Sequence, residues 1–366
     1  MISAILVLLL ILVYALLILW AERKIAAFVQ DRMGPMEVGY KGLGQSLADI
    51  LKLLQKEDIV PATADKFMFK LAPLLVFTSV FAGFACIPFI PSSEGNHIGL
   101  TLFFILSIIS LDVIGVIMAG WGSGSKYPVM GAMRAIAQIV SYEIPLTLSV
   151  LCVVITCQSL DLQEISYQQG LQANVGEEGM VKNYFLGLKF LGIETGNVGG
   201  IFTWNVMRSP FLFFAFMIFF ITALAECNRA PFDIPEADSE LVSGFHTEYS
   251  GFRFAILFLG EYALMLLLCL LGVILFLGSW NSPLPNIGSV KLCSWTTGEP
   301  GTWASSCWAV LWLSSKTLLL LFIQIMARWT YPRLRVDQLM NLCWKVLIPS
   351  GLLLIFVCSV WRILMI

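Results

Sequence analysis

Repeated apolar stretches of about 20 residues constrain this chain more than any other feature. About 20 helical residues, each rising 1.5 Å, cross the roughly 30 Å of hydrocarbon in a bilayer. About eight such stretches are present, at residues 2–20, 71–91, 100–120, 135–157, 209–225, 254–278, 308–327 and 346–364. Hydrophobic residues make up 58% of the 366 residues, and only 13% are charged. The sequence therefore predicts an all-α polytopic membrane protein in which residues 1–366 form a single integral membrane domain.

The first apolar stretch is expected to remain as a span. It has no basic segment in front of it and no small-residue cleavage site, and Glu22, Arg23 and Lys24 follow it directly. A secretory signal peptide would carry both of the missing features. The loops after the odd-numbered spans hold most of the lysine and arginine, which are retained on the cytoplasmic or matrix side. Both termini are therefore expected on the periplasmic or intermembrane side.

Four ionisable residues stand out within the predicted spans, where each costs about 2.5–3.5 kcal/mol to insert. They are Asp112, Glu143, Glu261 and Lys316. One interpretation is a set of structural ion pairs that fix the positions of the helices. The other is a path along which buried carboxyl groups take up and release protons. Pro145, two residues after Glu143, favours the second interpretation because a proline frees backbone groups that water can solvate.

The loop between the fifth and sixth spans is unusually acidic. A single arginine, Arg229, accompanies the acids Glu226, Asp233, Glu236, Asp238, Glu240 and Glu248. Asp233 can cap a short helix that begins near Pro235. A solvated acidic surface loop is the simpler alternative, but apolar residues alternate with the acids, which indicates a packed segment.

A short amphipathic helix is predicted in the first loop. Apolar residues recur there at helical spacing, at Leu43, Leu47, Ile50, Leu51 and Leu54. This helix is too short to span a membrane and should lie along the interface, with Asp49, Lys52 and Lys56 on its polar side. It either anchors the loop or forms, with the first span, an apolar groove that admits an amphipathic ligand from the bilayer.

Cysteine and histidine give no metal or haem site. The nine cysteines contain no CxxC pair, and the two histidines, His97 and His246, lie in loops rather than in spans. Cys293 and Cys307 lie in the same outer loop and form a disulfide only if that compartment is oxidising. We expect no metal and no cofactor bound by this chain.

Five groups of residues resemble one known family. They are Ala21–Lys24 with Gln30–Pro35, Ala48–Lys52 with Lys56 and Glu57, the run from Gly120 to Glu143, the run from Ala225 to Gly251, and Pro332–Gln338. On these motifs the chain resembles the quinone-site membrane subunit of the proton-translocating NADH:quinone oxidoreductase, respiratory complex I, which is the H subunit of the bacterial enzyme. The resemblance extends over all the predicted spans.

The resemblance implies how these residues act. Ubiquinone or menaquinone would enter from the bilayer between the first span, the interfacial helix and the sixth span. The residues expected to line the quinone tunnel and chamber are Arg23, Arg32, Asp49, Lys52 and Arg229. A proton relay of carboxylates would lead from the chamber into the membrane through Glu143, Glu226, Asp233, Glu236, Asp238, Glu240 and Glu261. Spans 2–6 would resemble the half-channel bundle of antiporter-like subunits.

The resemblance also implies partners and a location. The chain would hold no redox centre, while FMN and iron–sulfur clusters would reside in partner subunits. Those partners would be peripheral-arm subunits with the terminal cluster, small membrane subunits and antiporter-like subunits, together with lipid and quinone but no nucleic acid. A bacterial inner membrane is the expected location, with the mitochondrial inner membrane as the alternative.

Three features depart from the family or have no role in it. Asp238 stands where the family usually has glutamate, Asp112 has no family role, and the loops at 161–205 and 280–306 have no assigned purpose. Three alternative functions also remain at this point. They are the equivalent subunit of a membrane-bound hydrogenase or ferredoxin-linked complex, a secondary cation/proton transporter, and a structural scaffold. A transporter of that kind typically contains an internal repeat, which is not visible in this sequence.

Overall fold

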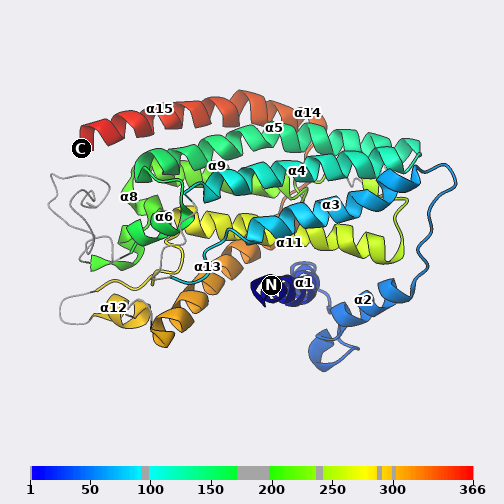
Figure 1. Ribbon diagram of the computed structural model, residues 1–366, viewed down its shortest axis with the longest axis horizontal. Helices are drawn as coiled ribbons and strands as arrows, with labels where there is room; N and C mark the ends of the chain where they lie inside the picture. Colours follow the sequence, from blue (N-terminus) through cyan, green and yellow to red (C-terminus); the bar gives the residue numbers. More distant parts are fainter. Residues whose placement is uncertain are drawn as a thin grey trace.

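The computed structural model describes residues 2–91, 99–170, 198–235, 242–286, 291–298 and 302–365, and in these ranges every regular element is helical (Figure 1). Seven of the described helices are long and apolar enough to cross a membrane, and an eighth apolar helix, α9, is shorter. In chain order they are α1 (Ile2–Val29), α3 (Lys66–Phe84), α4 (Thr101–Gly122), α5 (Lys126–Cys157), α9 (Pro210–Glu226), α11 (Gly251–Phe276), α13 (Trp303–Thr330) and the continuous helix Val336–Leu364. The predicted all-α polytopic fold is confirmed.

The helices begin and end at different residues from the predicted spans. α1 continues through Glu22, Arg23 and Lys24 to Val29. The predicted span 71–91 becomes Lys66–Phe84, where the Asp65 side chain accepts a hydrogen bond from the Phe67 N–H at 3.0 Å. Hydropathy marks the length that fits in hydrocarbon, whereas a helix continues until its terminal backbone groups are capped.

The last span is built from three consecutive pieces. α14 (Val336–Leu342) leads through a π-helical turn (Cys343–Leu347) into α15 (Ile348–Met365). The predicted span 346–364 therefore covers α15 and the end of the π-helical turn but leaves out α14. Near the turn, the Cys343 thiol donates to the Ser141 carbonyl at 3.0 Å, and the Tyr142 hydroxyl donates to the Leu339 carbonyl at 3.0 Å. These hydrogen bonds attach this segment to α5.

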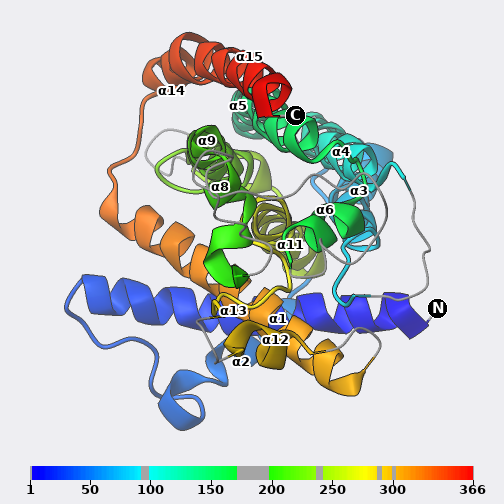
Figure 2. The same cartoon turned by 90° about the vertical axis from the view of Figure 1, so that its left-hand side faces the viewer.

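α11 lies at the centre of the bundle. Every residue from Tyr262 to Phe276 is buried. α3, α4, α5, α9 and α11, which are the predicted spans 2–6, lie along a common direction, whereas α1 crosses them steeply (Figures 1 and 2). Close approach between helices is possible because small residues lie at the contacts, as at Gly115 of α4, where an added Cβ would lie 2.5 Å from a Val76 methyl group.

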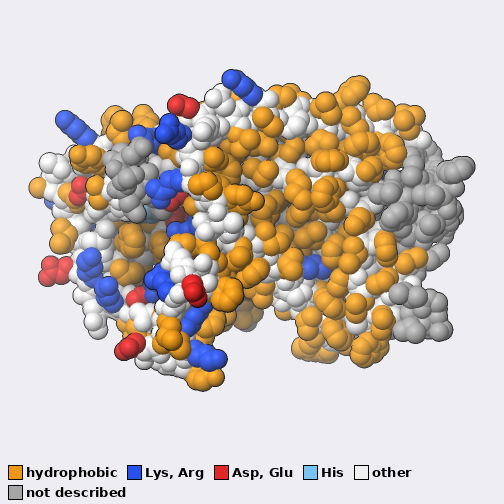
Figure 3. All heavy atoms as spheres, turned by 180° about the vertical axis from the view of Figure 1, so that it is seen from behind, with side chains coloured by type: hydrophobic (Ala, Val, Ile, Leu, Met, Phe, Trp, Pro, Cys, Tyr) orange, Lys and Arg blue, Asp and Glu red, His pale blue; other side chains and the backbone are white. Residues whose placement is uncertain are grey.

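Short helices connect these spans. They are η1 (Tyr40–Gly42), α2 (Gln45–Gln55), α6 (Leu162–Gln168), η5 (Gly200–Thr203), α8 (Asn205–Arg208), η6 (Gly244–His246) and α12 (Leu292–Thr297). α2 is the amphipathic helix predicted at Leu43–Leu54. It lies at one end of the molecule, where the charged side chains also gather, while the remaining visible face is mostly hydrophobic (Figures 1 and 3).

Backbone carbonyl groups and an aromatic ring surround the ammonium group of Lys316. It is buried in α13, and its Nζ donates to the carbonyls of Leu277, Ser279 and Asn281 at 2.9, 2.9 and 2.6 Å. The ammonium also lies 4.4 Å from the centre of the Trp204 ring. A cation that satisfies carbonyls at the C-terminal end of α11 stabilises that end of the helix. These partners are backbone carbonyls and not carboxylates, so they differ from the ion pairs that the first interpretation of the ionisable residues expected.

Candidate functional site

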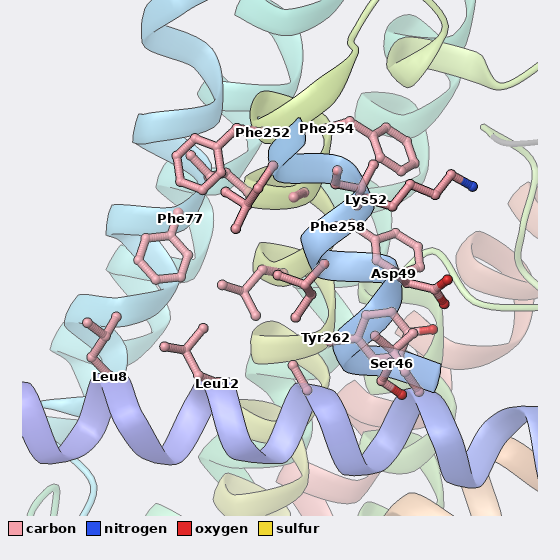
Figure 4. Close-up of a pocket in the computed structure, with 18 of the residues that line it drawn as sticks. Leu8, Leu12, Ser46, Asp49, Lys52, Phe77, Phe252, Phe254, Phe258 and Tyr262 are labelled. Carbon is pink, nitrogen blue, oxygen red and sulfur yellow. The ribbon is translucent and has the colours of Figure 1, made fainter. Parts of the chain in front are cut away.

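An apolar cavity of about 600 Å³ opens between α1, α2, α3 and α11 (Figure 4). Leu8 and Leu12 of α1, Phe77 of α3 and the aromatic residues Phe252, Phe254 and Phe258 of α11 surround it. Amphipathic α2 closes one side and contributes Ile50, Leu53 and Leu54. The groove that was one of two alternatives for the interfacial helix is therefore present as a cavity, and α11 completes its wall.

The polar side of α2 gives this cavity a charged end. Arg23 of α1 and Asp49 of α2 form an ion pair at 2.6 Å, and both line the cavity together with Lys52. Tyr262 of α11 also lines it. Arg32 differs from these residues, because it is exposed, contacts Gln30 at 2.7 Å and does not line this cavity. Arg23, Asp49 and Lys52, which were predicted to line the tunnel, therefore lie together at this cavity. Arg32 does not lie with them.

Substituting Arg23 with alanine tests the charged end of the cavity. Both members of the Arg23–Asp49 pair are partly exposed, and exposed ion pairs contribute about 0.2–1 kcal/mol. If the chain acts as its resemblance implies, Arg23→Ala should raise the apparent KM for short-chain quinones about two- to five-fold in the assembled oxidoreductase, with kcat little changed. Steady-state kinetics check this, with Lys24→Ala as the control, since Lys24 does not line the cavity. An unchanged KM would show that Arg23 does not contribute to binding in this cavity.

Tyr262 connects the cavity to a buried acid. Its hydroxyl donates to Glu22 Oε2 at 2.5 Å, and Glu22 also forms an ion pair with Arg328 of α13. Because α1, α11 and α13 each contribute one of these residues, the three helices are joined at the inner end of the cavity. Neither partner of Glu22 could be found from the sequence, since both are more than 200 positions away along the chain.

Arg229 lies next to Tyr262, on the side away from the cavity. Its guanidinium lies 4.2 Å from the centre of the Tyr262 ring, and it forms an ion pair with Glu261 at 3.7 Å. Arg229 follows α9 in a turn that Gln138 of α5 holds, because the Gln138 side-chain amide donates to the carbonyls of Ala225 and Phe232 at 2.7 and 2.8 Å. A buried, always charged group therefore links the cavity wall to the first carboxylate of the bundle interior.

Three carboxylates line a small void beyond Arg229. Asp112 of α4, Glu226 of α9 and Glu261 of α11 surround a space of about 10 Å³, which is close to the room that one water molecule needs. Among the described residues, Asp112 Oδ1 and Glu226 Oε2 are buried and have no hydrogen-bond partner. Such atoms are satisfied when water enters, so the void has the chemistry of a hydration site.

Glu143 extends this group of acids along α5. Its carboxylate accepts a hydrogen bond from the Ser110 hydroxyl of α4, and its charge and that of Asp112 both interact with Glu226. The carboxylates of Glu261, Asp112, Glu226 and Glu143, which we call the carboxylate chain, therefore come from four helices.

The acidic loop is described only in part. Asp233 is buried and forms an ion pair with Arg333 at 2.9 Å. Glu236, Asp238 and Glu240 lie outside the described residues, as does most of the short helix that Asp233 was predicted to cap. The predicted relay roles of these acids, and of Glu143, Glu226 and Glu261, stay predictions.

Several residues of the site have contacts that the sequence did not reveal. Asp112 was noted as a buried acid without a role, and the structure places it beside Glu226 and Glu261. His246 contacts Glu261, although the sequence indicated only that it lies in a loop. The position of Asp112 within an apolar span was a usable signal, whereas nothing in the local sequence indicates the contacts of Tyr262 or His246.

The cysteines form neither a disulfide nor a metal site among the described residues. The thiols of Cys293 and Cys307 are both free, so the disulfide considered from the sequence is not formed in the structure. Cys293 lies next to Thr297, with 3.9 Å between the sulfur and the hydroxyl oxygen. Within the ranges that the structure describes, no group of three His, Cys, Asp or Glu residues could hold a metal ion.

The fold and the site together define a polytopic helical membrane protein in which a lateral apolar cavity leads to a chain of buried carboxylates. The sequence matches the NADH dehydrogenase family over residues 2–359, so the chain belongs to that family. It is 58% identical to the second NADH-quinone oxidoreductase H subunit of Cytophaga hutchinsonii over 98% of both chains. It is 47% identical to the NADH-quinone oxidoreductase H subunit of Chlorobium luteolum over 94% of this chain and 84% of the relative. The resemblance seen in the sequence is confirmed.

Proposed function

We propose that this chain is the membrane subunit of an NADH-quinone oxidoreductase that admits quinone from the bilayer and couples its reduction to proton translocation. The observation that carries the proposal is the 600 Å³ apolar cavity, whose charged end connects through Tyr262 and Arg229 to the carboxylate chain. Small-molecule sites are typically apolar cavities of about 300–1,000 Å³ with a few placed polar groups. The names of the relatives agree with this assignment.

The cavity suits a molecule with a long apolar tail and a polar ring. Leucine and phenylalanine side chains of α1, α3 and α11 form an apolar surface for an isoprenoid tail. Arg23, Asp49 and Tyr262 provide hydrogen-bonding groups along the route of the ring. The chain supplies no electrons in this proposal. They arrive from flavin and iron–sulfur clusters in peripheral subunits.

In this proposal, electrostatic interactions couple quinone reduction to proton movement in the carboxylate chain. Reduction of a quinone to a quinol consumes two electrons and two protons, so both forms are neutral. The charge near the inner end of the cavity changes in the interval after the electrons arrive and before the protons are supplied, and again when nearby residues supply them. Arg229 transmits that change because it contacts both the cavity wall and Glu261. Buried carboxylates respond strongly, since charges interact more strongly where water is scarce. The carboxylate chain can then take up or release protons as the cavity changes state.

The distribution of basic side chains supports one orientation of the chain in the membrane. The end of the molecule with α2 carries most of the visible basic side chains and lies opposite the C-terminus (Figures 1 and 3). By the positive-inside rule we propose that this end faces the cytoplasm and that both termini face the periplasm. The named relatives are bacterial, which supports a bacterial inner membrane. Peripheral-arm subunits would then bind at the α2 end, and other membrane subunits beside the helices.

Narrowing the cavity tests the proposal. Ala15 of α1 is buried and lines the cavity, whereas Leu17 lies two residues away and is 53% exposed on another face. We expect Ala15→Phe to raise the KM for long-chain quinone about ten-fold, because the new ring occupies the path of the tail. Leu17→Phe should leave the KM unchanged. Turnover of washed membranes with a hydrophilic acceptor, which takes electrons directly from the peripheral arm, verifies that this arm is attached to the membrane subunits.

The outcome of this experiment separates the proposed site from others. An Ala15→Phe enzyme with the natural KM for long-chain quinone would show that the tail does not pass between α1 and α11. Equal effects of Ala15→Phe and Leu17→Phe would indicate a general disturbance of α1 and would also contradict the proposed path.

A further inference from the structure

A buried histidine joins the acidic loop to the carboxylate chain. His246 is 3% exposed, and its Nε2 lies 2.8 Å from Glu261 Oε1. Its ring lies between two phenylalanines, with centre-to-centre distances of 4.0 Å to Phe245 and 5.7 Å to Phe254. These aromatic neighbours cover the faces of the imidazole and leave its edge for hydrogen bonding. The contact with Glu261 is therefore well defined and shielded.

The turn that carries His246 is held closely by α5. An added Cβ on Gly131 would lie 2.8 Å from the Cα of Gly244 and 3.0 Å from the backbone N of Phe245. These contacts involve backbone atoms, which cannot move aside as a flexible side chain can. The close approach requires glycine at position 131 and fixes the η6 turn beside the bundle. His246 is thus presented to Glu261 by a rigid element.

Charged groups surround this contact on several sides. Arg229, after α9, lies 3.7 Å from the other oxygen of Glu261. Asp112 of α4 and Glu226 of α9 share the small void with Glu261 and Phe245. On α5 the charged residue nearest in sequence to Gly131 is Arg134, about one turn further on. Two loop residues therefore contact Glu261: Arg229, which keeps its charge, and His246, whose imidazole can hold either one or two protons.

We propose that His246 passes a proton between the loop at the α2 end of the molecule and Glu261, and so loads the carboxylate chain. This inference rests on the proposed function and adds a specific proton donor to it. Transfer requires a donor and an acceptor within about 2.6–3.2 Å, and the 2.8 Å contact satisfies that requirement.

The step is balanced in protons and charge. The His246 imidazolium gives its Nε2 proton to Glu261 Oε1, which leaves a neutral imidazole beside a neutral carboxylic acid. The neutral ring then holds its one proton on Nδ1. For the next transfer, the ring turns toward the loop, takes up a proton at Nε2 there, and turns back to Glu261. Glu261 releases its proton toward the void that Asp112 and Glu226 line. Arg229 pairs with the other oxygen of Glu261, so movement of charge in the quinone cavity can control the step through this ion pair.

Two substitutions distinguish proton transfer from a structural role. His246→Asn keeps a side chain that can hydrogen bond to Glu261 but cannot carry a proton, whereas His246→Phe loses both properties. If His246 transfers protons, both variants should lower coupled quinone reductase turnover about ten-fold. A structural role predicts that only His246→Phe is impaired. The pH profile of turnover between about pH 6 and pH 8 provides a second readout, and it should become flatter in His246→Asn.

Control variants distinguish an error in the role proposed for His246 from an error in the proposed function of the chain. The other histidine, His97, lies outside the described residues, and His97→Asn is expected to behave as the natural enzyme. The hydrophilic-acceptor assay verifies assembly, and His246→Gln serves if the asparagine variant does not assemble. Natural turnover and pH profile in His246→Asn would overturn the proposal. If Glu261→Gln then still abolishes proton translocation, the proposed function stands without a role for His246. Natural proton translocation in Glu261→Gln would contradict both the proposed function and the role of His246.

Discussion

Replacing Arg229 with methionine is expected to lower NADH:quinone reductase turnover of the assembled enzyme about ten-fold or more. Arg229 is buried and contacts both Tyr262, at the cavity wall, and Glu261, at the start of the carboxylate chain. Methionine keeps most of the apolar stem but removes the charge, and removal of one partner from a buried ion pair costs about 3–5 kcal/mol. The ten-fold loss corresponds to about 1.4 kcal/mol of transition-state stabilisation.

Two further variants identify the cause of that loss. Arg229→Lys retains the positive charge without the planar guanidinium, so we expect it to recover part of the turnover. Arg253→Met is the matched control, because Arg253 also pairs with an acid, Asp58 at 2.9 Å, and lies over an aromatic ring, but it does not contact the carboxylate chain. Equal losses in Arg253→Met and Arg229→Met would refute a specific bridging role for Arg229.

The second large effect is expected at Glu226. This side chain is 2% exposed, lines the void with Asp112 and Glu261, and interacts electrostatically with Glu143. Glutamine is nearly the same size but cannot take up or release a proton in this role. We expect Glu226→Gln to reduce coupled turnover and proton translocation about ten-fold, because it interrupts the chain between Glu261 and Glu143. Proton uptake into vesicles during NADH oxidation measures both quantities.

A matched substitution shows whether the loss at Glu226 is specific. Glu164 of α6 is exposed and accepts a hydrogen bond from Ser159, so Glu164→Gln removes an acid from outside the chain. We expect natural translocation in that variant. Translocation at the natural rate in Glu226→Gln would exclude Glu226 from the proton path.

The fold was largely predictable because hydropathy acts over whole segments. Apolar stretches located each span, and the period of the leucines located α2, but helix ends depended on caps such as Asp65 that lie outside the apolar stretches. The continuation of α1 past Glu22 was not predicted. Charged residues at a helix end do not stop a helix when they have partners, as Glu22 does in Arg328 and Tyr262.

The site was predictable to a lesser extent. The sequence indicated the ionisable residues and the polar side of α2, because charge within or beside an apolar segment is visible locally. Pairings such as Tyr262 with Glu22, or His246 with Glu261, depend on which helices become neighbours, and no local pattern encodes that. The same limit applies to Lys316, whose three carbonyl partners lie at the end of another helix.

The central claim is that quinone occupies the cavity between α1, α2 and α11 and approaches Tyr262. The most direct test is a density map of the assembled oxidoreductase with a bound long-chain quinone that carries bromine in its tail. We predict that the bromine signal lies beside Leu8 and Leu12 of α1, with the ring directed toward Tyr262. A bromine signal elsewhere, with no quinone density between these helices, would contradict the account.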